Sequence, residues 1–131
     1  MATGGTAMKA ELHSDNPKRA SRPVDLVHLA KQCLGDEFLE LEVLRLFDTT
    51  LNSYCSRLVL SADAEQTKLL LHSIKGASVG VGAWAIADLA KSMEADLREG
   101  RVLTQERIDD LAIMVGEVRT FIDRLIANSD E

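Results

Sequence analysis

Apolar side chains recur every three or four residues along most of this chain, and this spacing restricts the fold more than any other feature of the sequence. Such spacing places apolar residues on one side of an α-helix. No stretch alternates apolar and polar residues as a half-buried strand would. The sequence therefore predicts an all-α fold. The longest stripe contains Ile108, Leu111, Val115, Val118, Ile122 and Leu125.

Residues that favour the ends of helices divide this pattern into five segments. The first segment is short, and only a few residues separate the other four, which favours antiparallel neighbours. The predicted architecture is an up-and-down antiparallel four-helix bundle with a short additional N-terminal helix. The candidate N-caps are Asp25, Asp36, Asp63 and Thr104, the second helix is expected to end near Ser61 and the third near Gly80, and Gly100 is a candidate residue just past the end of the fourth.

The length of 131 residues suits one domain with one hydrophobic core. The first 22 residues have little apolar periodicity and contain Asn16-Pro17, a pair that favours a turn. We expect residues 1–23 to form a flexible N-terminal tail and residues 24–131 to form the helical bundle.

The net charge of −6 argues against a nucleic-acid partner, because a phosphate-binding surface would be strongly basic. No apolar run approaches the roughly 20 residues of a membrane-spanning helix, and the N-terminus lacks the apolar core of a signal peptide. We therefore expect no membrane association and a cytoplasmic location. Cys33 and Cys55 have no CxxC spacing, so we expect free thiols.

The stretch L-L-L-H-S-I-K-G-A-S-V-G-V-G-A, residues 69–83, begins like a buried helix and then fills with glycine. Because each helical residue advances by about 100°, Leu70, Ile74, Ala77 and Val81 fall on the side opposite His72. We expect His72 to face solvent or a partner. Within about 60° of it lie Lys68, Lys75, Gly76 and Val79.

These neighbours suit phosphoryl chemistry. A neutral imidazole, which titrates near about pH 6.5 when unperturbed, is a nucleophile through its ring nitrogens and could accept a phosphoryl group. Lys75, one turn further along, could place a positive charge near the phosphoryl oxygens, and Lys68 is a weaker candidate for the same role. A glycine inside a helix costs about 1 kcal/mol relative to alanine. Gly76 therefore indicates clearance for another protein's active site.

The segment H-S-I-K-G-A-S-V-G-V-G-A, from His72 to Ala83, resembles the H-x-x-K-G-[SA]-[SA]-x-x-[hydrophobic]-G-A signature of histidine-containing phosphotransfer domains. The Gly35-Asp36 turn and the later M-E-A-D-L-R-E-G segment are also similar to that family. Two positions depart from the pattern, since Val81 stands where a larger residue is common and Gly80 adds flexibility.

The resemblance implies a carrier in a multistep phosphorelay of two-component signalling. His72 would accept a phosphoryl group on Nε2 from a receiver-domain aspartate and pass it to another receiver, with Lys75 as the charge near the phosphate. The expected partners are response-regulator receiver domains and an upstream hybrid histidine kinase. We expect no cofactor of its own, because Mg²⁺ would sit on the receiver. The chain would be a monomeric phosphoprotein without autonomous kinase activity, and it has no glycine-rich nucleotide loop.

The family docks receivers through apolar residues beside the histidine and on the first helix. Many members also place a polar side chain from the second helix near the histidine, but no motif identifies that residue here. His13 and His28 are expected to have no role, and Trp84 is expected to pack in the core or against the adjacent turn. The expected partner-binding residues are Lys68, Gly76, Val79, Leu69, Leu26 and Val27.

Three other interpretations stay open. The chain could be the phosphoacceptor domain of a chemotaxis-type histidine kinase, whose histidine segment can also read H-S-I-K-G, although the N-S-D-E ending favours a standalone protein. It could be a helical interaction module whose partner binding is unaffected by His72→Gln. A small metal-dependent enzyme is disfavoured, because there is no HxxxH or paired-cysteine spacing.

Overall fold

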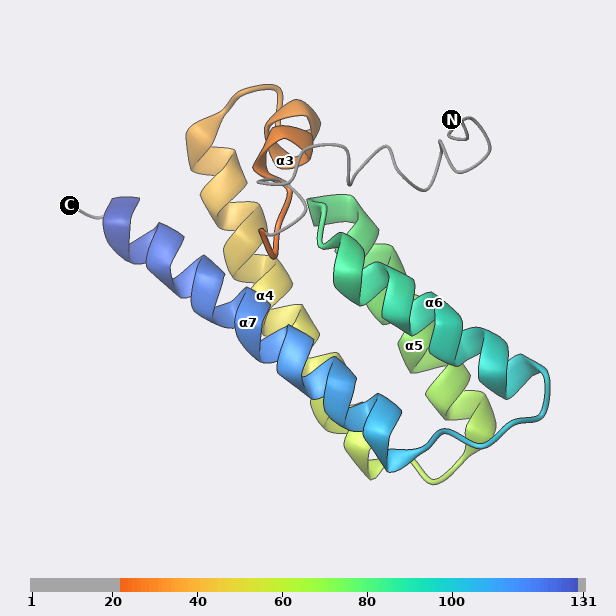
Figure 1. The fold of residues 1–131 in the computed structure, drawn as a ribbon. Coiled ribbons are helices and arrows are strands. Elements are labelled where there is room, and N and C mark those ends of the chain that lie inside the picture. The colour runs from red at the N-terminus through yellow and green to blue at the C-terminus, as the bar shows by residue number, and fades with distance from the viewer. Residues whose placement is uncertain (1–21, 130–131) are drawn as a thin grey trace, which may run out of the picture.

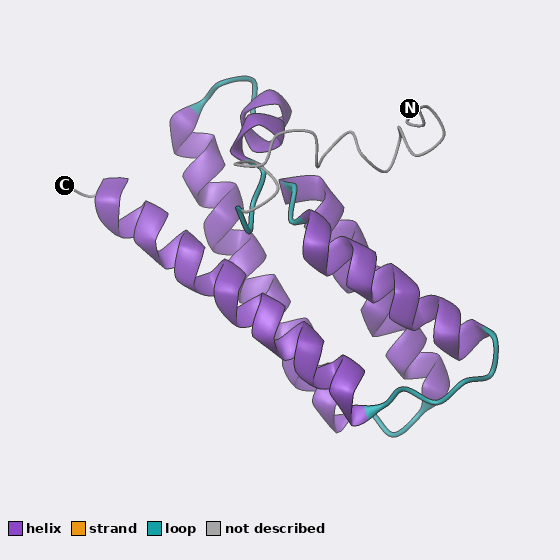
Figure 2. Cartoon of the chain, in the orientation of Figure 1, coloured by secondary structure: helices purple, strands orange, loops and turns teal. Residues whose placement is uncertain are grey.

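The computed structural model describes residues 22–129, and every regular element in that range is a helix (Figure 2). The predicted all-α class is confirmed for these residues. Residues 1–21 of the predicted tail, which include His13, lie outside the described residues. In chain order the helices are α3 (Leu26–Gln32), α4 (Glu37–Leu60), α5 (Ala64–Val81), α6 (Trp84–Arg98) and α7 (Gln105–Ser129).

The four long helices lie along one another, and α3 lies at one end of them (Figure 1). Helix α5 packs against α4 and α6, and α7 packs against the same two elements, α4 and α6. Their predicted apolar stripes meet in one core, which includes Leu44, Leu51, Leu71, Ile74, Met93 and Ile122. None of these helices combines the length and the apolar content needed to cross a membrane.

Side-chain caps begin the helices where the sequence predicts them. Each acidic cap accepts a hydrogen bond from a backbone N–H of the first turn, which satisfies one donor that the helix itself leaves unpaired. Helix α4 ends at Leu60, next to Ser61, and α6 ends just before Glu99 and Gly100, whose φ is 83°. The Asp25 side chain accepts from His28 N, Asp36 from Leu39 N and Asp63 from Glu65 N, each at 3.1 Å, and Thr104 Oγ1 accepts from Arg107 N at 3.2 Å.

Helix α5 ends one residue beyond Gly80, because Gly82 adopts the left-handed conformation with φ 84°. A β-carbon at Gly82 would lie 3.0 Å from Asp25 Cβ and 3.1 Å from Asp25 O. Glycine is therefore required here both by the backbone conformation and by the close approach of the segment that leads into α3.

Polar contacts attach α3 to the turn between α5 and α6. Asp25 N donates to Gly82 O at 2.9 Å, and Trp84 Nε1 donates to Asp25 Oδ2 at 3.0 Å. His28 Nε2 lies 3.0 Å from Val79 O, and its ring meets the Trp84 ring edge to face at 4.9 Å. Trp84 was expected in the core or against the adjacent turn, and the structure places it against Asp25 and His28 at the start of α3. The expectation that His28 has no role is wrong, because its imidazole holds α3 against the end of α5.

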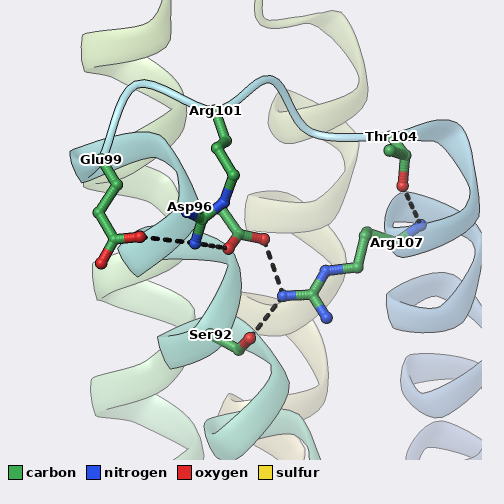
Figure 3. A network of polar contacts seen from close by, with 6 residues as sticks. All are labelled: Ser92, Asp96, Glu99, Arg101, Thr104 and Arg107. Atoms are coloured by element: carbon green, nitrogen blue, oxygen red, sulfur yellow. Dashed lines mark hydrogen bonds and ion pairs between the residues drawn. The ribbon is translucent and has the colours of Figure 1, made fainter.

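An ionic network fixes the loop between α6 and α7 (Figure 3). Asp96 accepts hydrogen bonds from Arg101 Nη2 at 2.8 Å and from Arg107 Nη2 at 2.9 Å. The hydrogen bond from Arg101, followed by the charge of Arg107, holds the pKa of Asp96 below its usual value. Arg101 also pairs with Glu99 at 2.6 Å, and Arg107 Nη2 donates to Ser92 Oγ. The network therefore stabilises the connection that brings α7 back along the bundle.

We expect Gly82→Ala to lower the free energy of unfolding by about 2 to 3 kcal/mol, because it combines a left-handed alanine with a clash against Asp25. Gly80→Ala is the matched control, since it lies two residues away in the helix and has open space around the new methyl group. That variant should be more stable than wild type by up to about 1 kcal/mol. Urea unfolding followed by circular dichroism measures both. Equal stability of the two variants would contradict this account of the turn.

Candidate functional site

His72 lies in the middle of α5 with its side chain 64% exposed. On the other side of the helix, Leu70, Ile74 and Val81 are buried in the core. The predicted orientation of His72 is therefore confirmed. Packing of one side of α5 forces the imidazole to the surface, where another molecule can reach it.

A carboxylate of α6 lies beside the imidazole. His72 Nδ1 is 3.4 Å from Glu94 Oε2, a separation within ion-pair range and slightly longer than the usual hydrogen bond of about 2.7 to 3.2 Å. Glu94 is only 8% exposed, which is unusual for a charged residue. The polar neighbour that the structure describes for His72 thus comes from α6, rather than from the second helix as expected from the family.

Sequence reasoning missed Glu94, although a signal existed. Ala87 and Ala90 are buried on α6, and Glu94 follows Ala90 by four residues, which continues the same side of the helix. A carboxylate at a position where the pattern calls for an apolar residue marks a buried charge that needs partners.

Two cations supply those partners. Lys75 Nζ lies 3.7 Å from Glu94 Oε1, and Arg98 Nη2 lies 3.2 Å from Glu94 Oε2. Together with a neutral imidazole, this cluster of His72, Lys75, Glu94 and Arg98 carries one net positive charge. A site with that balance attracts an anionic group such as a phosphoryl group.

The geometry distinguishes the two ring nitrogens of His72. When one imidazole nitrogen faces an acceptor, it retains the proton, and the other nitrogen then carries a lone pair. Because Nδ1 faces Glu94, this arrangement favours Nε2 as the nucleophile. The contact can shorten once the ring becomes positively charged, as contacts at reacting groups often do.

The other predicted residues near His72 divide into two kinds. Lys68 Nζ pairs with Glu65 Oε2 at 2.8 Å, so its charge is compensated one turn away and the structure does not bring it to Glu94. Gly76 is exposed, and a β-carbon built there meets no atom within 4 Å. The space next to the imidazole is thus open, as the clearance hypothesis requires.

Apolar side chains remain exposed around this cluster. Leu69 is 68% exposed and Val79 is 43% exposed, both on α5. On α3, Val27 is 48% exposed, whereas Leu26 packs partly against the core. The contact of His28 with Val79 O brings α3 next to the end of α5. Val27, Leu69 and Val79 are therefore the predicted docking residues that offer the most apolar surface.

Within the described range, no group of three or more His, Cys, Asp and Glu side chains is arranged to hold a metal ion. Cys33 and Cys55 are free thiols, as predicted. Burial raises the pKa of the Cys33 thiol and raises that of Cys55 to about 11. Neither thiol is therefore a ready nucleophile at neutral pH.

Comparison with protein-family models finds a match to the Hpt domain over residues 42–127, a range that contains the whole cluster around His72. Neither the curated proteins nor the solved structures gave a match. Since the matched range covers about two thirds of the chain, the chain belongs to the Hpt domain family.

If Gly76 serves a partner rather than the fold, Gly76→Ala should raise the free energy of unfolding by about 0.5 to 1 kcal/mol. Gly116→Ala in α7 is the matched control, because a methyl group there also enters open space. Urea unfolding of both variants measures the effect. A clear loss of stability confined to Gly76→Ala would show that the fold itself requires this glycine.

Proposed function

We propose that this chain is a phosphohistidine carrier in a multistep phosphorelay. His72 Nε2 accepts a phosphoryl group from the aspartate of one receiver domain and passes it to the aspartate of another. The observation that carries the proposal is an exposed imidazole whose Nδ1 faces a buried, cation-paired carboxylate, within a chain of the Hpt domain family. The carrier acts as a cytoplasmic monomer, and residues 24–131 form its up-and-down four-helix bundle with α3 at one end.

The transfer step follows from the position of the proton. The Nε2 lone pair attacks phosphorus, the new N–P bond forms, and the P–O bond to the aspartate breaks, so the carboxylate leaves with its electron pair. The ring keeps its Nδ1 proton and becomes positively charged. Glu94 lies where it stabilises that charge, and the reverse sequence delivers the phosphoryl group to a second receiver.

Lys75 and the receiver share the stabilisation of the phosphoryl oxygens. The Lys75 ammonium lies one turn from His72 and reaches Glu94, so it stands at the edge of the site where the oxygens would gather. The receiver domain supplies Mg²⁺ and the reacting aspartate. The chain is consequently a phosphoryl carrier that partner proteins phosphorylate, and its upstream source is a hybrid histidine kinase.

Docking uses the apolar residues around the imidazole. Leu69 and Val79 flank His72 on α5, and Val27 adds apolar surface from α3. Gly76 leaves space for the receiver loops to approach the imidazole. Lys68, which pairs with Glu65, and Leu26, which packs partly against the core, complete the proposed docking residues.

The direct test uses a purified receiver that carries a radiolabelled aspartyl phosphate in the presence of Mg²⁺. Wild type should take up label that acid removes and base does not, as expected for phosphohistidine, and His72→Gln should take up none. His13→Gln is the control for loss of a histidine as such. Equal labelling of the His72 variant, or no transfer from several receivers, would contradict the proposal and favour an interaction module.

The docking surface has its own test. Leu69→Asp places a charge among the docking residues and should lower kcat/KM for transfer from the receiver by about tenfold or more, as loss of a well-placed apolar contact does. Leu60→Asp is the matched control, because this leucine is 83% exposed at the far end of α4. Comparable losses in both variants would show that the region around His72 is not the docking surface.

A further inference from the structure

Arg98 belongs to the family-like M-E-A-D-L-R-E-G segment, which assigns it no role, and it has a specific place in the cluster around His72. It is the last residue of α6 and lies four residues after Glu94. An acidic residue followed by a basic residue at this spacing is the favourable order for a helical ion pair, and a cation at a helix C-terminus also interacts well with the helix dipole. The helix itself thus places the guanidinium beside Glu94.

The two oxygens of Glu94 have different partners. Arg98 Nη2 and His72 Nδ1 both approach Oε2, at 3.2 Å and 3.4 Å, whereas Lys75 approaches Oε1 at 3.7 Å. Arg98 and Lys75 therefore draw the carboxylate in two directions, and its orientation reflects the balance between them. In the structure, the oxygen that Arg98 approaches, Oε2, is also the one that lies beside the imidazole.

We propose that Arg98 is a positioning residue that holds Glu94 Oε2 against His72 Nδ1 and so keeps the imidazole in the tautomer with a bare Nε2. The inference rests on the proposed function in one respect, namely that Nε2 of His72 is the phosphoryl acceptor. Arg98 acts through Glu94, and its exposed side chain leaves the bundle core untouched.

Loss of the guanidinium has a definite consequence. With Lys75 as the remaining cation near Glu94, the carboxylate turns toward Lys75 and away from Nδ1. The imidazole then returns toward the Nε2–H tautomer, which dominates for an unconstrained neutral histidine. A protonated Nε2 has no lone pair in the ring plane, so the fraction of nucleophilic His72 falls.

The test combines a spectroscopic and a chemical readout, and neither involves a receiver. Histidine side-chain ¹⁵N shifts, recorded at a pH where the spectra themselves show the neutral ring, report the tautomer of His72. Phosphoramidate serves as the phosphoryl donor for the rate measurement: its P–N bond breaks, ammonia leaves, and the N–P bond to Nε2 forms. Arg98→Gln and Arg98→Lys are compared with Arg45→Gln, which removes an exposed arginine from an ion pair with Glu42 on α4.

We expect wild type and Arg45→Gln to show the Nδ1–H tautomer. Arg98→Gln should shift the ring toward Nε2–H and slow phosphorylation by about threefold to fivefold, the size expected for a partly exposed ion pair. Arg98→Lys should restore most of the Nδ1–H population and most of the phosphorylation rate. An unchanged tautomer in Arg98→Gln, with or without a slower reaction, or a failure of lysine to restore it, would overturn the inference.

The result also separates this inference from the proposed function. If phosphoramidate labels His72 and the tautomer depends on Arg98 but no receiver exchanges phosphate, the relay proposal fails and the positioning role stands. If receivers transfer phosphate to wild type and to Arg98→Gln alike while the tautomer is unchanged, the relay proposal stands and the positioning role fails.

Discussion

Packing of Leu71 and Ile74 in the core fixes the rotation of α5 about its own axis, and the arrangement of the site depends on that rotation. Once these side chains are buried, His72 has to point outward, and Lys75 and Gly76 have to lie beside it. A rotation of a single residue step would bury the imidazole and expose an apolar position. The hydrophobic effect therefore sets the direction of the His72 side chain.

The second constraint is electrostatic. A carboxylate as buried as Glu94 is costly unless other groups compensate its charge, and here an ammonium and a guanidinium do so. The same two cations leave the cluster with net positive charge, so the groups that make Glu94 tolerable also make the surroundings of His72 favourable for a phosphoryl group. One set of interactions thus stabilises the packing of α6 on α5 and also favours the chemistry proposed for the site.

Sequence reasoning predicted the features that depend on neighbours within one helix. The caps at Asp25, Asp36 and Asp63 and the orientation of His72 follow from local spacing, and the structure has them where expected. The match to the Hpt domain family agrees with the resemblance carried by residues 72–83.

The missed features depend on contacts between helices. Glu94 reaches His72 only because α6 packs on α5 at a particular rotation, and His28 finds its acceptor, Val79 O, 51 residues away. Lys68 and Lys75 are nearly equivalent in the sequence, one on each side of His72. They differ because Lys68 pairs with Glu65 on its own helix whereas Lys75 meets the carboxylate from α6. Periodicity alone cannot distinguish such cases, since it carries no information about the facing helix.

A phosphoryl carrier has to expose its nucleophile and still orient it, and the pair α5 and α6 reconciles these demands. In the part of the chain that the structure describes, the polar contact of the ring lies on its Nδ1 side, which leaves the Nε2 side for the proposed transfer. Small residues allow the two helices to approach closely: Ala87 and Ala90 are buried on α6, and Ala77 lies against the core from α5.

The turn that joins the helices consists of Gly82 and Ala83, and α3 is attached to it through Asp25. Because this turn is short and anchored to α3, it limits sliding of α6 along α5 and so helps to set the distance between His72 and Glu94. Orientation of the imidazole therefore does not require a partner to be bound.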